Sequence, residues 1–255
     1  MANVPIATNG GADPALYAKE RPITILVTGF GPFQERFPVN PSFEIIKLLP
    51  NIFTPGEKEI QIIAYDHPIR VCYDEVRELV PVIHGSYAAG VDMILHLGMA
   101  SGRNFYTAEL HAHRDGYYKN KDVDGKTLPS DHGETYFNDC AQLLRTSLDY
   151  DRVLQRWQWN MKNLQKSSVA YEADCRPSDD AGHYLCDYIY FNSLAWFARN
   201  PTPRADGQAN ERPVLFLHVP ANSDPQALER GKEVTLSLIE AMVESWCEST
   251  NVEMV

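Results

Sequence analysis

The sequence predicts an α/β protein, a three-layer α/β/α sandwich around a mostly parallel, twisted sheet. Near-continuous apolar runs, rich in β-branched residues, occur at 23–29, 91–97 and 213–219, as is typical of strands buried on both faces. Segments with one apolar helical face separate these runs. Polar, Gly- or Pro-containing segments follow the strands. Strands that alternate with helices in this way indicate a sheet covered on both sides.

The elements can be assigned in chain order. The first strand runs into a Gly- and Pro-rich turn at 29–33, and a helix then begins with Asn40 as its cap and Pro41 at its first position. Pro81 should kink or break the next helix. The further expected strands and helices occupy, in order, residues 59–65, 72–89, 91–97, 104–114, 185–197, 213–219 and 225–247.

Residues 134–175 are harder to assign. Their leucines, together with Val153, Trp157 and Met161, suggest helix, whereas the charged runs suggest a surface insertion. Residues 1–20 are small and polar and are expected to form a flexible N-terminal tail. The predicted organisation is therefore a tail followed by a single domain over 21–255, with an insertion around 134–175.

Composition narrows the classes of partner. The net charge of −11 argues against nucleic acid or an anionic membrane as a partner. The five cysteines are widely spaced without a C-x-x-C pair, which argues against a zinc ribbon or a disulfide framework. The N-terminus lacks the apolar core of a signal peptide, and no run is long enough to span a bilayer. A cytoplasmic protein with free thiols is expected.

The stretch 178–187 carries a candidate nucleophile. Asp179 or Asp180 is expected to cap a helix, so that Cys186 falls in its opening turns. The positive end of the helix dipole should lower the pKa of the thiol there and favour the reactive thiolate. The alternative is that Cys186 is simply a small buried hydrophobic residue.

Nucleophilic cysteine catalysis also needs a base and a group that orients the base. His218 ends a core strand, which is a rigid position for a base; the alternative is a histidine satisfied by neighbouring groups at a strand end. Glu109 lies among modestly apolar residues and could orient the base, although a surface carboxylate is the common role of a single glutamate.

Four blocks, in order along the chain, resemble the signatures of type I pyroglutamyl peptidases, also called pyrrolidone-carboxylate peptidases. They are residues 25–33 with 39–42, residues 97–103 followed by Glu109, residues 180–186, and residues 217–220. The resemblance implies that Cys186 is the nucleophile, His218 the base and Glu109 the third catalytic residue. It also implies that three apolar residues bind the substrate: Phe30, Phe33 and Met99.

The resemblance further implies a phosphorylase/hydrolase-like sandwich and a cysteine exopeptidase that needs no cofactor. Its substrates would be small peptides with an N-terminal pyroglutamate, a neutral lactam that suits an apolar aromatic slot. A homo-oligomer is compatible with this assignment. Leu110 and His113 stand where the family usually has arginine and asparagine, so an inactive relative that binds such peptides is an alternative. A nucleoside phosphorylase-like enzyme is another, although no phosphate site is evident.

Two histidines, His111 and His113, lie two residues apart and would share one face of a strand, as a metal-binding pair requires. No third ligand is evident in the sequence, and we expect no metal site. His183, three residues before Cys186, is expected to be a polar residue on the face of the helix.

Overall fold

The computed structural model describes residues 22–33, 35–56, 59–87, 90–203, 209–210 and 213–250. The predicted N-terminal tail, residues 1–20, lies outside them. The strands are β1 (Ile23–Gly29), β2 (Ile52–Phe53), β3 (Ile60–Ala64), β4 (Met93–Met99), β5 (Tyr106–Glu109), β6 (His111–His113), β7 (Leu143–Arg145), β8 (Cys175–Ser178), β9 (Thr202–Pro203), β10 (Ala209–Asn210) and β11 (Val214–Val219). The helices are α2 (Pro41–Lys47), α3 (Tyr73–Tyr87), the 3₁₀ helix η1 (Tyr117–Lys119), α4 (His132–Tyr136), α5 (Tyr150–Lys162), α6 (Leu185–Arg199) and α7 (Pro225–Thr250).

Within the described residues, the main sheet has seven strands in the order β2-β3-β1-β4-β11-β5-β8. The four central neighbours β3, β1, β4 and β11 run parallel, and so do β5 and β8. The antiparallel pairs of this sheet are β2 with β3 and β5 with β11. The sheet is therefore mostly parallel, as the sequence predicts.

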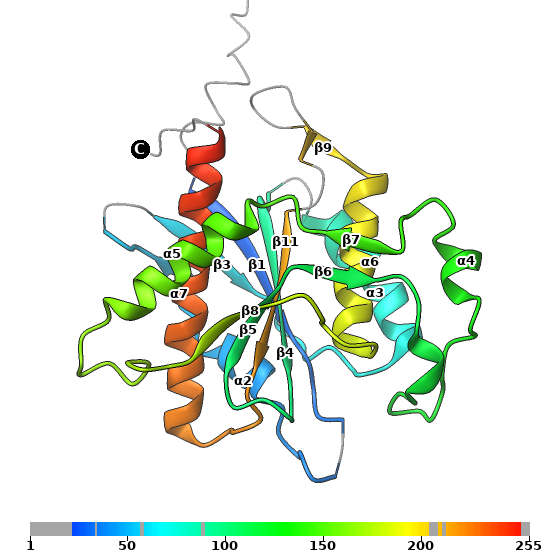
Figure 1. Cartoon of the computed structure of the whole chain (residues 1–255), viewed down its shortest axis with the longest axis horizontal. Helices are drawn as coiled ribbons and strands as arrows, with labels where there is room; N and C mark the ends of the chain where they lie inside the picture. The colour runs from blue at the N-terminus through cyan, green and yellow to red at the C-terminus, as the bar shows by residue number, and fades with distance from the viewer. Residues whose placement is uncertain are drawn as a thin grey trace, which may run out of the picture.

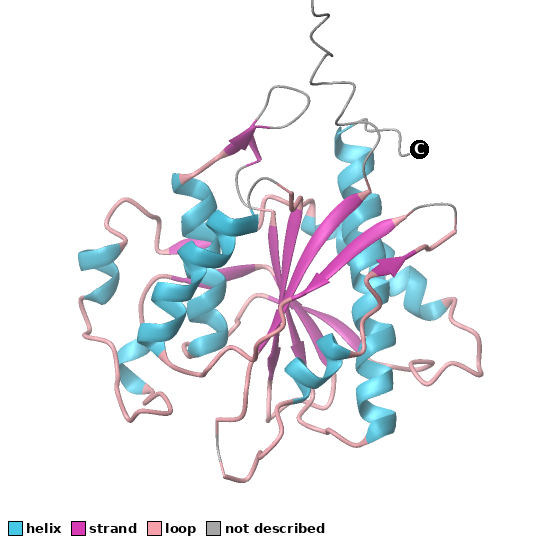
Figure 2. Ribbon diagram, turned by 180° about the vertical axis from the view of Figure 1, so that it is seen from behind, coloured by secondary structure: helices cyan, strands magenta, loops and turns pink. Residues whose placement is uncertain are grey.

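Helices cover both faces of this sheet. In Figure 1 the sheet is seen close to edge-on, with α2, α5 and α7 on one side and α3 and α6 on the other. Figure 2 shows the same three layers from behind. Each side has its own apolar core, one between the sheet and α7 and one between the sheet and α6. The α/β/α sandwich is thus confirmed.

Helix starts follow the sequence signals closely. The side chain of Asn40 accepts a hydrogen bond from the backbone N–H of Ser42, and Pro41 opens α2. Asp224 accepts from the backbone N–H of Ala227 at 2.8 Å at the start of α7. Of the kink or break predicted at Pro81, a break is not found, because α3 continues through this residue to Tyr87, and a kink stays a prediction. The exposed proline faces solvent, while the buried face of α3 packs against α6.

The segment 104–114 is not one strand. β5 belongs to the main sheet, whereas β6 pairs with β7 in a separate small sheet, and the half-buried Leu110 lies at the change of direction. The leucines of 143–145 therefore form a strand rather than the helix expected there.

The segment 134–175 contributes to the interior. Helix α5 packs against α7, and Trp157 is completely buried between them, with its indole N–H donating to the carbonyl of Val234. These contacts argue against an exclusively surface position, while the assignment of 134–175 as an insertion in a single domain stays a prediction. None of the described helices combines the length and the apolar character needed to span a membrane.

Candidate active site

Strand pairing places His218 beside two elements of the predicted site. In the parallel pair of β11 with β4, His218 is opposite Gly98. In the antiparallel pair of β11 with β5, His218 is opposite Thr107, and Phe216 is opposite Glu109. Since side chains alternate along a strand, Thr107 and Glu109 face the same side of the sheet. Backbone pairing alone thus brings Gly98, Thr107 and Glu109 next to the strand that carries His218.

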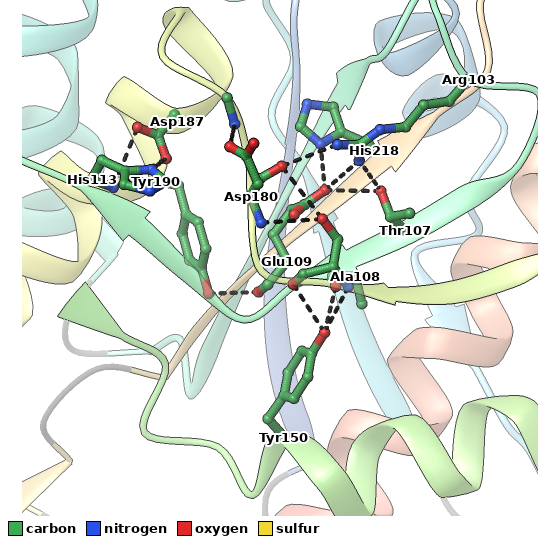
Figure 3. Close-up of polar contacts among 12 residues, drawn as sticks. Arg103, Thr107, Ala108, Glu109, His113, Tyr150, Asp180, Asp187, Tyr190 and His218 are labelled. Atoms are coloured by element: carbon green, nitrogen blue, oxygen red, sulfur yellow. Dashed lines mark hydrogen bonds and ion pairs between the residues drawn. The ribbon is translucent and has the colours of Figure 1, made fainter. Parts of the chain in front are cut away.

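Glu109 and His218 form a direct pair. Nδ1 of His218 lies 2.8 Å from Oε1 of Glu109, and the carboxylate is completely buried (Figure 3). Glu109 is therefore not a surface carboxylate. Because an ionised carboxylate can only accept, Nδ1 of His218 donates and Nε2 is left to exchange a proton.

A cation and a hydroxyl support this carboxylate. Nη1 of Arg103 donates to Oε1 of Glu109 at 2.7 Å, and the hydroxyl of Thr107 donates to the same oxygen at 2.8 Å. Burial alone would raise the pKa of Glu109, but the hydrogen bond and charge of His218, with further hydrogen bonds from Ser178 and Arg103, outweigh it and hold the pKa below its usual value. Glu109 is therefore charged at neutral pH.

Arg103 also reaches the segment that precedes the candidate nucleophile, because its Nη2 donates to the carbonyl of Asp180 at 3.0 Å (Figure 3). Sequence reasoning gave Arg103 no role, although it ends the second family-like block. The signal that could have found it is chemical: a carboxylate buried next to a base needs a nearby cation, and Arg103 is the arginine that precedes Glu109 in sequence.

Two tyrosines fix the strand that carries Glu109. The hydroxyl of Tyr190, on α6, donates to the backbone carbonyl of Glu109 at 3.1 Å. The hydroxyl of Tyr150, on α5, donates to the carbonyl of Ala108 at 2.7 Å and accepts from the N–H of Ser178. Figure 3 shows both rings approaching β5 from the helices. Helices on opposite faces of the sheet thus hold one short strand in place.

Cys186 is the second residue of α6, as the expected position in an opening turn requires. The expected cap is wrong, however, because the helix starts at Leu185 and the residue before it, Tyr184, makes no side-chain capping bond. Asp180 instead accepts a hydrogen bond from the N–H of Gly182 at 2.8 Å, which closes a tight turn. Gly182 has φ +87°, and this conformation postpones the start of the helix.

The thiol of Cys186 lies against the strand next to His218. A Cβ atom added at Gly98 would lie 2.7 Å from Sγ of Cys186 and 2.6 Å from the ring of Phe216. Glycine at 98 therefore makes the space that the sulfur occupies. Because Gly98 is the cross-strand partner of His218, this contact brings the candidate nucleophile and base to the same point of the sheet.

The pKa of the thiol shifts in the direction opposite to the one expected. Burial raises the pKa of Cys186 to about 12, and the negative charges of Glu109 and Asp187 act in the same direction, whereas Arg103 opposes them. The expected lowering of this pKa is thus wrong, because burial removes the hydration that the charged form of the thiol needs. Burial therefore favours the neutral thiol, from which a neighbouring base would have to remove the proton.

The three predicted substrate-binding residues differ in exposure. Phe30 is 2% exposed and Met99 is 6% exposed, so both side chains are almost completely buried. Phe33 is partly exposed, and its ring centroid lies 6.2 Å from that of Tyr184, two residues before Cys186. Phe33 is the one of the three whose side chain has free surface near the thiol.

His183 is not on the face of a helix, because it precedes α6. Its ring instead contacts that of His113 on β6, with centroids 4.4 Å apart. The prediction of a polar helix-face residue is therefore wrong, and sequence spacing gave no indication that residues 113 and 183 meet.

Comparison with known proteins finds a family match over most of the chain. Residues 23–245 match the family model described as pyroglutamyl peptidase. Human pyroglutamyl-peptidase 1 is 24% identical over 221 residues, which is 86% of this chain and 90% of the human protein. Pyrrolidone-carboxylate peptidase of Thermosipho africanus is 28% identical over 197 residues, 77% of this chain and 80% of that protein.

Solved structures share the fold. Pyrrolidone carboxyl peptidase from Thermococcus litoralis superposes with a TM-score of 0.67 at 17% identity, covering 89% of this chain and 96% of that one. A mutant pyrrolidone carboxyl peptidase from Pyrococcus furiosus gives a TM-score of 0.66 at 20% identity, covering 87% and 99%. The same sandwich therefore persists where most side chains differ.

Proposed function

The chain belongs to the pyroglutamyl peptidase family, and we propose that it is a cysteine omega-peptidase that removes an N-terminal pyroglutamyl residue from small peptides. The observation that carries this proposal is the buried Glu109–His218 pair on adjacent strands, beside the thiol of Cys186. These are the three parts that nucleophilic cysteine catalysis requires.

In the proposed mechanism His218 acts as a general base, since the thiol is neutral before attack. Nε2 of His218 takes the proton of Cys186 as the sulfur bonds to the pyroglutamyl carbonyl carbon. The ionised Glu109 holds Nδ1–H and stabilises the imidazolium that forms. His218 then protonates the leaving amine, the C–N bond breaks, and an acyl-enzyme remains. Water attacks this thioester, giving its proton to His218, and releases pyroglutamate and the free thiol.

The start of α6 suits the oxyanion of this reaction. The first backbone N–H groups of a helix have no partner within the helix, and Cys186 is at its second position. The side chain of Tyr184, the residue before the helix, makes no capping bond to them. We propose that they hold the negative oxygen that develops when the sulfur attacks.

Recognition of the substrate is proposed to rest on apolar contact. The pyroglutamyl ring is a neutral lactam, so a charged anchor has nothing to pair with. Phe33 would contact the ring, while the more buried Phe30 and Met99 would form the wall behind it. Backbone groups of the 29–33 turn would hydrogen-bond the lactam amide.

The remaining properties follow from sequence and composition. We propose a cytoplasmic location, which suits the five widely spaced cysteines. Nucleic acid and membranes are not among the proposed partners, in keeping with a net charge of −11. Self-association into a homo-oligomer is proposed as well and can be checked by light scattering.

The test compares two fluorogenic amides that differ in one group. The purified protein should release the fluorophore from a pyroglutamyl amide, but not from the matching prolyl amide, whose ring lacks the lactam carbonyl and carries a charged amine. Binding of a pyroglutamyl peptide without any turnover would overturn the peptidase proposal and favour an inactive relative. Equal turnover of both amides would overturn the specificity.

A further inference from the structure

We propose that His113, His183 and Asp187 form a binding site for a divalent transition-metal ion such as Zn²⁺. They come from β6, the segment before α6, and the first turn of α6. One potential ligand atom from each lies within 4.8 Å of the others. None of the three side chains is among those proposed for peptide hydrolysis, so the site does not depend on that function.

The donor set fits this class of ion. Two imidazoles and one carboxylate are typical ligands of Zn²⁺ and of other first-row divalent metals, and three protein ligands leave one position for water. Ligand atoms in a tetrahedral zinc site are roughly 3.4 Å apart, as follows from metal–ligand distances of about 2.0–2.2 Å. The ligand atoms, which lie within 4.8 Å of one another, must therefore approach by up to about 1.4 Å. His183 is exposed and can rotate to do so.

Neighbouring groups already orient the ligands. The hydroxyl of Tyr117 donates to Oδ2 of Asp187 at 2.7 Å, and the backbone N–H of His113 donates to Oδ1 at 3.1 Å. Nδ1 of His183 lies 3.1 Å from the carbonyl of Asp115, which can only accept. Nδ1 therefore carries the proton and Nε2 is free to bind a metal, an arrangement common in histidine ligands.

The backbone leaves room for one of these rings. Gly116 has φ +106°, and a Cβ atom added there would lie 2.7 Å from Nδ1 of His183. The ring thus packs directly on a glycine backbone, opposite His113. This placement puts the second imidazole next to the first.

An ion pair explains only part of the arrangement. Asp187 is completely buried, and Nδ1 of His113 lies 3.3 Å from its Oδ1, which accounts for the buried charge. It does not account for a second imidazole held 4.4 Å from the first. A bound cation would use all three groups at once. The sequence led us to expect no metal site, and His111, the histidine two residues before His113, is not part of the three-residue cluster.

The experiment measures binding of Zn²⁺ alone, by isothermal titration calorimetry, to the full chain carrying Cys186→Ser. That background removes the reactive thiol as a competing ligand. We expect one Zn²⁺ per chain. Adding His183→Asn or His113→Asn should weaken binding by at least about 10- to 100-fold. The matched control is His67→Asn, an exposed histidine 3.6 Å from Asp66, which should bind as the parent does.

A spectrum identifies the ligands independently. Co²⁺ bound in this site should show visible d–d bands without the strong near-ultraviolet sulfur-to-metal band that a cysteine ligand produces. Because His183 is exposed, His183→Asn should keep the parent's melting temperature, so loss of metal binding cannot be ascribed to unfolding. Absence of Zn²⁺ binding would overturn the proposal, as would binding that His113→Asn and His183→Asn leave unchanged.

Discussion

The two halves of the candidate active site are held in different ways. His218 and Glu109 lie on adjacent strands in the middle of the sheet, where backbone pairing and the hydroxyls of Tyr150 and Tyr190 fix them. Cys186 lies on the first turn of a helix whose start has no side-chain cap. We call these two parts the strand half and the helix half. The hydrogen bond from Arg103 to the carbonyl of Asp180 joins the strand half to the segment that leads to Cys186.

This difference separates two tasks. The strand half sets the geometry and charge around the proposed base, since Glu109 is buried, ionised and paired with His218. The helix half holds the thiol of Cys186, whose pKa is raised by burial and which the proposed base would have to deprotonate. Each prediction below breaks one half, or the link between them, and compares it with a matched position elsewhere.

The largest effect should come from the helix half. Cys186→Ser should lower kcat by about 10⁴-fold or more, because the nucleophile is lost. Cys175→Ser is the control: burial also raises the pKa of the Cys175 thiol to about 12, but this residue is on β8, opposite Tyr106 and not beside His218. Hydrolysis of the pyroglutamyl amide measures both. Full activity of Cys186→Ser would end the cysteine-peptidase assignment.

In the strand half, Glu109→Gln should lower kcat on the order of 10²-fold or more while changing KM little, because the charge that stabilises the imidazolium is lost and the shape is kept. Glu134→Gln removes a carboxylate that is 67% exposed and also pairs with an arginine, and should leave kinetics unchanged. Rates within twofold of the parent for both variants would remove Glu109 from the site.

The contact between the halves can be broken by one methyl group. Gly98→Ala should lower kcat/KM by roughly 10- to 100-fold, because the new Cβ displaces the sulfur of Cys186. Gly102→Ala, four residues later, meets no atom within 4 Å and should be neutral. Circular dichroism should show both variants folded. Equal activity of the two would mean that the thiol does not need its observed position.

Loss of the link through Arg103 should lower activity less than the changes above. Arg103→Met should lower kcat about tenfold, since Glu109 and the carbonyl of Asp180 lose a shared donor. Arg176→Met, which removes an exposed arginine paired with Asp174, is the control and should leave kcat unchanged. A kcat for Arg103→Met equal to that of the parent would show that the link is not needed for turnover.

The same variant has a pH signature. The folded pKa of Glu109 lies below its ordinary value, so the stability it contributes is present above its unfolded pKa of about 4.3 and is lost as pH falls through the folded pKa. Without Arg103 the folded pKa should rise and that contribution should shrink. The stability deficit of Arg103→Met in urea should therefore be larger at pH 7 than at pH 3.5. A deficit independent of pH would contradict the charge pairing.

The smallest effect concerns substrate contact. Phe33→Ala should lower kcat/KM for the pyroglutamyl amide about 3- to 10-fold, because one aromatic face against the lactam is lost. Phe37→Ala removes the ring stacked on Phe33 at 6.3 Å and should have less effect, since it does not contact Tyr184. If the Phe37 variant loses more activity, the substrate ring lies elsewhere.

Sequence patterns predicted the parts of this protein that depend on local chemistry. Apolar periodicity predicts the strand at 23–29 and the alternation of strands with helices. The bonding of a single side chain predicts the helix cap at Asn40. The proximity of His218 and Glu109 was expected from family resemblance, and the structure supplies the physical cause in the antiparallel register of β11 and β5.

What sequence could not predict depends on long-range packing. The helix of Cys186 starts later than its acidic residues suggested, because Asp180 bonds within a turn at Gly182. The thiol pKa was expected to fall, but it depends on how much hydration the neighbouring chain removes. The meeting of His113 with His183 joins residues 70 positions apart, which no local spacing reveals.

The position of β11 also determines which part of the site can move. All six residues of this strand are buried, and it has a hydrogen-bonded neighbour on each side. Its amide hydrogens should therefore exchange with solvent only when the whole sheet opens, whereas amides of the 179–184 segment should exchange through small local openings. Any adjustment to a bound peptide must then occur by movement of that segment around a stationary histidine. Inhibitors that change the conformation of this segment would be able to abolish activity without moving the proposed base, His218.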